Sequence, residues 1–145
     1  MSNAFTVKVT GLDVVERRLK GLGPDISKKV LRNSVAAGAR VVRKAAEGRV
    51  PVDTGTLKRS LYIKQIREES NPSKQTYYVG SRHGKKYQKK GLDAYYFPFV
   101  EFGTEKMAAR PFLRPAFESS KDAAANAIGE KLKQGVDKYA NYTIG

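Results

Sequence analysis

The segment "FVEFGTEKMAARPFLRPAF", residues 99–117, decides how this chain folds, because it combines rigid, apolar and flexible positions at one place. Its nineteen residues include four phenylalanines, two prolines and one glycine. Gly103 can adopt backbone angles that are closed to other residues, so we expect a sharp turn after Phe102. Pro111 and Pro115 then restrict the path of the chain. The segment predicts a hydrophobic corner that fixes a final helix onto the sheet, with apolar side chains on both sides of the turn: Phe99, Phe102, Phe112, Leu113 and Phe117.

Two further expectations concern the charged and the aromatic side chains of this segment. Glu101 and Arg110 are expected to pair across the corner, where a buried ion pair would specify geometry more than it would stabilise. The aromatic rings also fit a second use, as anchors in a neighbouring subunit, because aromatic residues dominate interface hot spots. Burial within the chain is the preferred interpretation, since contiguous apolar sequence usually ends in the core.

Helical patterns lie on both sides of the corner in the sequence. A short helix is expected over 13–20, and a long amphipathic helix from Asp25 until Gly48 and Pro51 end it. Its predicted inner side consists of Ile26, Val30, Ala37, Val41 and Ala45, widened by Leu31, Val35, Val42 and Ala46. A second long helix follows Pro115 and runs nearly to the C-terminus, with its apolar side formed by Phe117, Ala124, Ile128, Leu132, Val136 and Tyr139.

Strand patterns fill the start and the middle of the chain. Residues 5–9 alternate apolar and polar side chains, and 61–66 and 75–80 are rich in β-branched and aromatic residues around the turn 70–73. The run 94–102 fits either a strand or a buried helical turn, and Pro98 is awkward inside both. Grouped strands between helices predict an α+β fold: an antiparallel sheet of about four strands packed against two long helices, in a single domain over 1–145.

Composition removes several functional classes. The chain has 145 residues, no cysteine and one histidine, His83, so disulfides, thiolate metal sites and cysteine nucleophiles are excluded. No metal or cofactor motif is present, and no apolar run approaches the roughly 18 residues that a membrane span requires. We therefore expect a soluble, non-exported protein without a metal or cofactor.

Charge is the strongest compositional signal. Twenty-eight Lys and Arg residues against fourteen Asp and Glu give a net charge of +14, which favours phosphate or acidic protein surfaces. The densest cluster lies in a loop at about 82–92, which we expect to be flexible and solvated: Arg82, Lys85, Lys86, Lys89 and Lys90. These five residues are candidates for non-specific contact with DNA, because phosphate binding needs no base recognition. Tyr87 and the nearby tyrosines would suit base stacking, although strand tyrosines are more often half-buried core residues.

The tripeptide Asp53-Thr54-Gly55 is also found in aspartic proteases, in which two carboxylates share a proton. A three-residue match is weak, and Pro51 interrupts the approach to it. The preferred interpretation is structural. Side-chain oxygens of Asp53 and of Thr54 or Thr56 would accept backbone N–H bonds at the start of the next element, where Gly55 allows the bend.

Two ordered motifs resemble one protein family over nearly the whole chain. They are "VPVDTGTLKRSL" at 50–61 and "YYFPFVEFGTEKMAARPFLRPAF" at 95–117, preceded and followed by a long helix. The combination is similar to the small tail-completion or head–tail joining proteins of long-tailed bacteriophages. Within it, the motif positions are Asp53, Thr54, Gly55, Glu101, Phe102, Gly103, Arg110, Pro111 and Phe112.

The resemblance implies a non-enzymatic virion protein that is assembled in the host cytoplasm and located in the neck or tail. Such a subunit would form a homo-oligomeric ring around the DNA channel, between head-closure proteins and the tail terminator or tail tube. The basic loop is not part of the family pattern, so its DNA contact is a separate hypothesis. The alternatives are a non-specific nucleic-acid-binding protein, which rests on charge, and an aspartic protease using Asp53.

Overall fold

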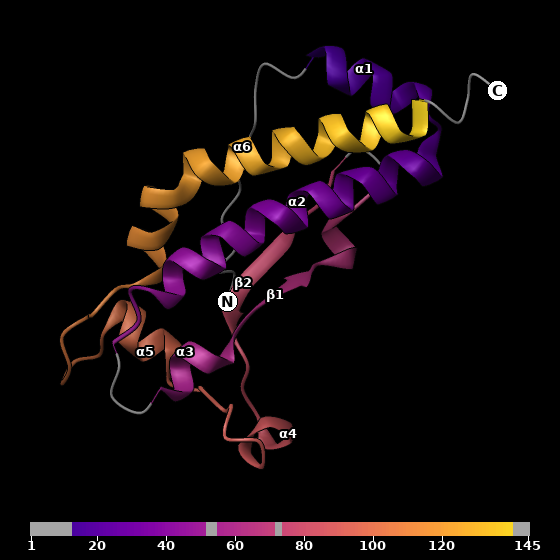
Figure 1. The fold of residues 1–145 in the computed structure, drawn as a ribbon. Coiled ribbons are helices and arrows are strands. Elements are labelled where there is room, and N and C mark those ends of the chain that lie inside the picture. Colours follow the sequence, from indigo (N-terminus) through magenta and orange to yellow (C-terminus); the bar gives the residue numbers. More distant parts are fainter. Residues whose placement is uncertain (1–12, 52–54, 72–73, 141–145) are drawn as a thin grey trace.

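The computed structural model describes residues 13–51, 55–71 and 74–140, and its elements are arranged around two long helices (Figure 1). In chain order they are α1 (Asp13–Gly21), α2 (Pro24–Glu47), α3 (Thr56–Ser60), β1 (Leu61–Gln65), the 3-10 helix η1 (Arg67–Glu69), β2 (Tyr77–Ser81), α4 (Lys85–Gln88), α5 (Phe97–Phe102) and α6 (Leu113–Ala140). Both long helices, the short first helix and the two central strands were predicted from periodicity. The predicted strand at 5–9 lies outside the described residues.

Helices α2 and α6 pack against each other along their length, and small residues let them approach closely. A Cβ atom at Gly38 of α2 would lie 2.6 Å from the Ile128 side chain of α6. One at Gly135 of α6 would lie 2.5 Å from the Val30 side chain of α2. Each helix thus accepts a branched side chain of its partner at a glycine, and pairing 38 with 128 and 30 with 135 makes the two helices antiparallel.

Strands β1 and β2 form an antiparallel hairpin in which Leu61 lies opposite Ser81 and Gln65 opposite Tyr77. The hairpin packs on α2, whereas α6 lies on a different side of α2 (Figure 1). Leu61 and Val79 point inward because alternate residues of a strand share one face. Within the described residues, the only strands are these two, so the predicted sheet of about four strands is not supported.

Two physical reasons explain the smaller sheet. The ambiguous run 94–102 contributes helix α5 and no strand, because Pro98 is accommodated in the first helical turn, where its missing N–H costs nothing. The final helix also packs on α2 rather than directly on the sheet, so a wide sheet is not needed to cover it.

Buried side chains form two clusters, one toward each end of the helix pair. The cluster nearer β1 and β2 includes Val42, Leu61, Phe97 and Phe112. The other joins α1 to the far end of the pair through Leu19, with Val30, Ile128, Leu132 and Val136. In the described part of the chain, no helix combines the length and the apolar character needed to span a membrane.

Candidate functional site

The hydrophobic corner, which we define as residues 97–117, is organised around one buried carboxylate. Glu101 belongs to α5 and is only 6% exposed. Its Oε2 atom accepts hydrogen bonds from the backbone N–H groups of Phe112 at 2.8 Å and Leu113 at 3.0 Å, and its Oε1 atom accepts one from Arg114 at 2.9 Å. These N–H groups lie at the start of α6 and have no partner within that helix. Glu101 therefore caps α6 from another element.

Gly103 ends α5 and confirms the predicted sharp turn. Its φ of 75° and ψ of 175° lie in a region that is essentially restricted to glycine. A Cβ atom here would also lie 2.8 Å from the backbone nitrogen of Ala109. Beyond it, the Thr104 N–H donates to the Met107 carbonyl at 2.9 Å and the Arg110 N–H donates to the Val100 carbonyl at 2.8 Å. The chain thus reverses tightly before α6. The predicted pairing of the Glu101 and Arg110 side chains stays a prediction.

The aromatic residues of the corner divide into two groups. Phe112 is fully buried, and its ring meets that of Phe97 edge to face with centroids 5.5 Å apart. Phe99 and Phe102, by contrast, are 48% and 57% exposed. Tyr95 and Met107 are also largely exposed. Among the described residues these four are the exposed large apolar side chains, and we call them the apolar patch: Tyr95, Phe99, Phe102 and Met107.

Burial within the chain is therefore confirmed for part of this segment, whereas the use of its rings as anchors in a neighbouring subunit stays a prediction. Leu113 is buried with Phe112, and Phe117 packs against the same core cluster. Pro111 is exposed just before this buried pair. The core-facing residues hold α6, while the side chains of the apolar patch are exposed.

The basic loop folds into a projection that we call the basic finger, residues 82–94 (Figure 1). Its two ends are joined to the body and to each other. The Arg82 N–H donates to the Ser60 carbonyl and the Ala94 N–H donates to the Arg82 carbonyl, both at 2.9 Å. Nearer the tip of the finger, the Gly84 N–H donates to Asp93 Oδ1 at 2.9 Å. Glycines with positive φ, 108° at Gly84 and 66° at Gly91, flank the helical tip. The predicted flexibility of this segment stays a prediction.

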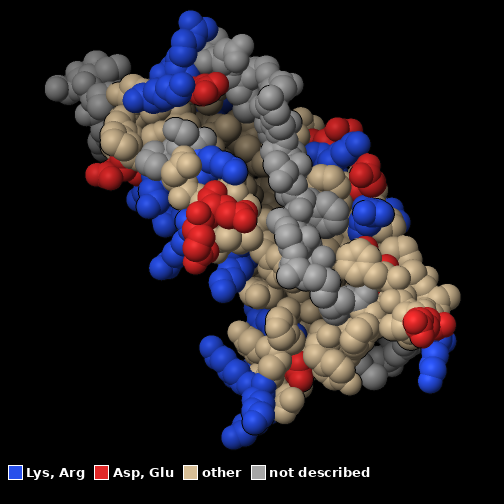
Figure 2. All heavy atoms as spheres, turned by 180° about the vertical axis from the view of Figure 1, so that it is seen from behind, with Lys and Arg blue, Asp and Glu red and all other residues tan. Residues whose placement is uncertain are grey.

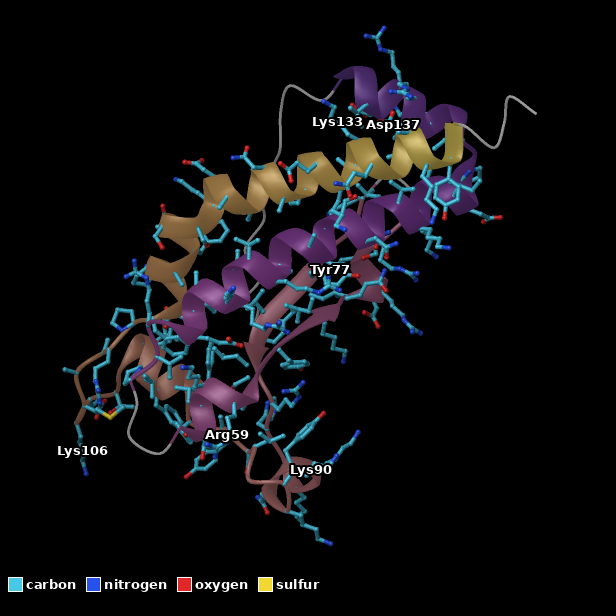
Figure 3. All side chains as sticks on the ribbon, viewed as in Figure 1. Arg59, Tyr77, Lys90, Lys106, Lys133 and Asp137 are labelled. Atoms are coloured by element: carbon cyan, nitrogen blue, oxygen red, sulfur yellow. The ribbon has the colours of Figure 1, made fainter. Side chains whose placement is uncertain are left out.

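The charged residues of the finger fall into two environments. The Arg82 guanidinium lies over the Tyr62 ring of β1, 5.1 Å from its centroid. The four lysines, Lys85, Lys86, Lys89 and Lys90, are exposed, and Figure 3 labels Lys90 at the end of the projection. Figure 2 shows the corresponding group of Lys and Arg side chains at the lower end of the molecule. Arg82 thus contacts the body of the protein, whereas the four lysines are exposed and the ring contact of Lys86, with Tyr87, lies within the finger.

The protease-like tripeptide is only partly within the described residues, since Asp53 and Thr54 lie outside them. Gly55 precedes α3 with a φ of 76°, which confirms that it allows the bend. Arg59 of α3 lies against Gly55, with its Nη1 atom 2.9 Å from where a Cβ would stand. Leu57 and Ser60 of the same helix are buried. The described part of this motif therefore starts a helix that anchors in the core.

The titratable groups of the described residues include a tyrosine with a raised pKa, and they form no cluster suited to a metal ion. Burial raises the pKa of the Tyr77 phenol above its ordinary value of 10.0, and the nearby Arg32 and Arg40 guanidinium groups partly offset this. Figure 3 shows Tyr77 between the hairpin and α2. The described residues contain no group of three or more His, Cys, Asp or Glu side chains arranged to hold a metal ion.

Sequence reasoning missed the capping role of Glu101 and the membership of Tyr95 and Met107 in the apolar patch. For the first, the sequence indicates that α6 lacks a cap of its own, but it does not indicate which residue supplies one. The residues before α6 are Arg110, Pro111 and Phe112, none of which has a side chain of the type that caps helices. A long helix that begins without its own cap needs a partner from elsewhere in the chain.

Comparison with known proteins gives one match. A family model described as "Bacteriophage HK97-gp10, putative tail-component" matches residues 13–103, which is more than half of the chain. The matched range contains α1 to α5, including Glu101 and the basic finger. No curated protein and no solved structure matches the chain significantly. Because this family model matches more than half of the chain, the chain belongs to the HK97 gp10-like family of bacteriophage tail components.

Proposed function

We propose that this protein works as one domain and as a non-enzymatic structural component of the phage neck. In this proposal it is a ring subunit of the head–tail connector or tail-completion region, between the head-closure proteins and the tail terminator or tail tube. Family membership supports the proposal, because the matched family is described as a tail component of bacteriophages. A structural role also fits a corner built from a capped helix and close packing.

The apolar patch supports assembly with a neighbouring copy. Its four exposed side chains lie within residues 95–107, and three of them belong to the corner itself. Concentrated exposed apolar surface marks interaction sites, and aromatic residues supply most of the energy in such contacts. A ring requires a heterologous interface, in which one surface of each copy meets a different surface of the next. We assign the apolar patch to one side of that interface.

The decisive experiment interrupts the gene in the phage that encodes the protein. We expect lysates to contain DNA-filled heads and separate tails in electron micrographs, and supplying the wild-type protein should restore joined particles. Fully infectious particles without the protein would refute the proposed function. Purified protein, alone and with the neighbouring neck proteins, should then be tested for closed rings by native mass spectrometry and negative-stain imaging.

A double variant tests the apolar patch itself. Phe99→Ser with Phe102→Ser removes two exposed rings, so the melting temperature should change little while ring formation falls. Phe112→Ser serves as the contrasting variant, because its ring is fully buried and its loss should lower stability itself. Unchanged ring formation in the double variant would remove the patch from the interface.

A further inference from the structure

A further inference concerns the basic finger. It rests on the proposed function and identifies a binding partner for the finger. We propose that Lys85, Lys86, Lys89 and Lys90 form a contact site for the phosphate backbone of duplex DNA, and that Arg82 positions the finger without being part of this contact. The sequence grouped all five cations as one set, and the structure separates them.

The arrangement of the lysines is unfavourable for the isolated protein. Lys85 and Lys89 are four residues apart, as are Lys86 and Lys90, within α4 and the turn that follows it. Like charges at this spacing repel each other on a helical surface. The nearest carboxylate in the sequence, that of Asp93, accepts a hydrogen bond from the Gly84 N–H and so helps to close the finger. An external polyanion would relieve the repulsion.

The finger also has internal hydrogen bonds in the absence of any partner. Its helical tip is closed by hydrogen bonds from the Leu92 N–H to the Tyr87 carbonyl at 3.0 Å and from the Gly91 N–H to the Gln88 carbonyl at 3.1 Å. At its base, the Ser81 hydroxyl donates to the Ala94 carbonyl at 3.1 Å, and Ala94 is buried. These bonds favour one shape before contact, so binding would order fewer backbone residues than in a loop without such bonds.

DNA fits this surface better than a protein does. Protein interfaces are depleted in lysine at their centres and enriched in aromatic residues and methionine. The finger has the opposite composition, with exposed lysines and without any of the exposed large apolar residues of the described chain. Lysine contacts to phosphate need no particular base, which suits a channel through which an entire genome passes. In a ring, one finger per subunit would repeat the site around that channel.

The position of Arg82 explains why it is excluded from the contact. Its guanidinium is engaged with the Tyr62 ring, and its backbone N–H and carbonyl both take part in the bonds at the base of the finger. Arg82 is thus a positioning residue. Arg82→Lys would keep the charge but remove the planar guanidinium that lies over the Tyr62 ring.

The test compares two quadruple variants of the full chain. In the finger variant, Lys85, Lys86, Lys89 and Lys90 are all changed to Gln. In the matched control, four exposed lysines on α2 and α6 are changed to Gln: Lys28, Lys44, Lys131 and Lys133. Each variant lowers the net charge of +14 by four, so any effect of overall charge is the same in both.

The readout is the slope of the logarithm of the binding constant for a labelled duplex of random sequence against the logarithm of salt concentration. The slope is negative, and each lost phosphate contact makes it shallower by about 0.9. The loss of four contacts therefore predicts a slope that is shallower by about 3.6. Between 50 and 200 mM salt, those contacts alone correspond to a change in affinity of about a hundred-fold. The control variant should retain the wild-type slope.

Three results would overturn the inference: equal slopes for the finger variant and the wild type, equal reductions in both variants, or equal retention of the protein on polyglutamate and on DNA. The last result would assign the finger to an acidic protein surface. Ring formation is measured on the same samples by native mass spectrometry. Rings that form normally while the finger variant loses its slope support both proposals, whereas a lost slope without rings in any sample supports DNA contact and contradicts the proposed assembly.

Discussion

Replacing Glu101 with glutamine tests whether one buried carboxylate holds the corner together. Glu101→Gln is nearly isosteric, so the packing around it is preserved, but only one carbonyl oxygen remains as an acceptor. In its better orientation, this oxygen keeps the bonds from the Phe112 and Leu113 N–H groups. The new amide NH₂ then faces the Arg114 N–H, 2.9 Å from the position of Oε1 in the wild type.

The expected loss can be worked from these contacts. Leaving one backbone donor of α6 unsatisfied, opposite another donor, costs about 1–3 kcal/mol. Removing the negative charge from the N-terminal end of a 28-residue helix costs a further 0.3–1 kcal/mol or so, and up to about 2 kcal/mol in a partly buried site. The free energy of unfolding should therefore fall by about 2–4 kcal/mol. For a chain of this size, that corresponds to a decrease in melting temperature of about 5–15 °C.

Thermal unfolding followed by circular dichroism is the assay, and Glu105→Gln is the matched control. Glu105 lies four residues away, is exposed, and has no hydrogen bond or ion pair through its side chain in the described structure. Its replacement changes the net charge equally and should alter stability by no more than about 0.5 kcal/mol. If the two variants melted at the same temperature, the capping argument would be refuted, because the Glu101 carboxylate would then contribute no more than a surface charge.

Three further predictions concern backbone, packing and pH. Gly103→Ala should lower stability by about 1–3 kcal/mol from backbone strain alone, and more if the turn cannot move, which urea unfolding would measure. Gly38→Ala should lower the free energy of unfolding by about 1–3 kcal/mol, because the added Cβ would be overpacked against Ile128. Gly21→Ala is the control and should be nearly neutral, since an added Cβ there would meet no atom within 4 Å. Equal melting temperatures for the two variants would contradict the close approach of α2 and α6. The raised pKa of Tyr77 means that the folded state favours the neutral phenol. The contribution of Tyr77 to the free energy of unfolding is therefore complete below pH 10 and is lost as pH rises through the raised pKa. In parallel thermal melts, Tyr77→Phe should become more stable relative to the wild type only above pH 10.

Periodicity predicted the long helices and the hairpin because each is a local pattern of apolar side chains. It placed the inner side of α2 less well. The predicted residues Ile26, Ala37 and Val41 are only half-buried, whereas Ser34 and Gly38 are buried at the contact with α6. Hydrophobic patterns give no weight to serine or glycine, although these are the residues that allow two helices to approach closely. The Ser34 hydroxyl bonds to the Val30 carbonyl at 2.7 Å, which satisfies it inside the interface.

The corner was predictable in position but not in detail. Gly103 and the two prolines marked the turn, and the resemblance placed the motif in a phage family that the family match confirms. The partner of Glu101 was beyond sequence reasoning because the bonded N–H groups lie eleven to thirteen residues further along the chain. Interactions at that separation depend on tertiary structure, whereas capping patterns are read over three or four residues.

The helical form of α5 also determines which aromatic side chains of the corner are buried and which are exposed. Phe97 and Glu101 are four residues apart and share the face that is turned inward, while Phe99 and Phe102 are three apart and share the exposed face. An extended strand would place residues 97, 99 and 101 on one face, and would bury Phe99 with Phe97. The sequence left open whether 94–102 forms a strand or a helix. A strand would turn Phe99 toward the core, whereas the observed helix leaves Phe99 and Phe102 exposed. Because the Glu101 carboxylate bonds to α6 from within the same helical turn, the direction of those two rings is tied to the start of the final helix.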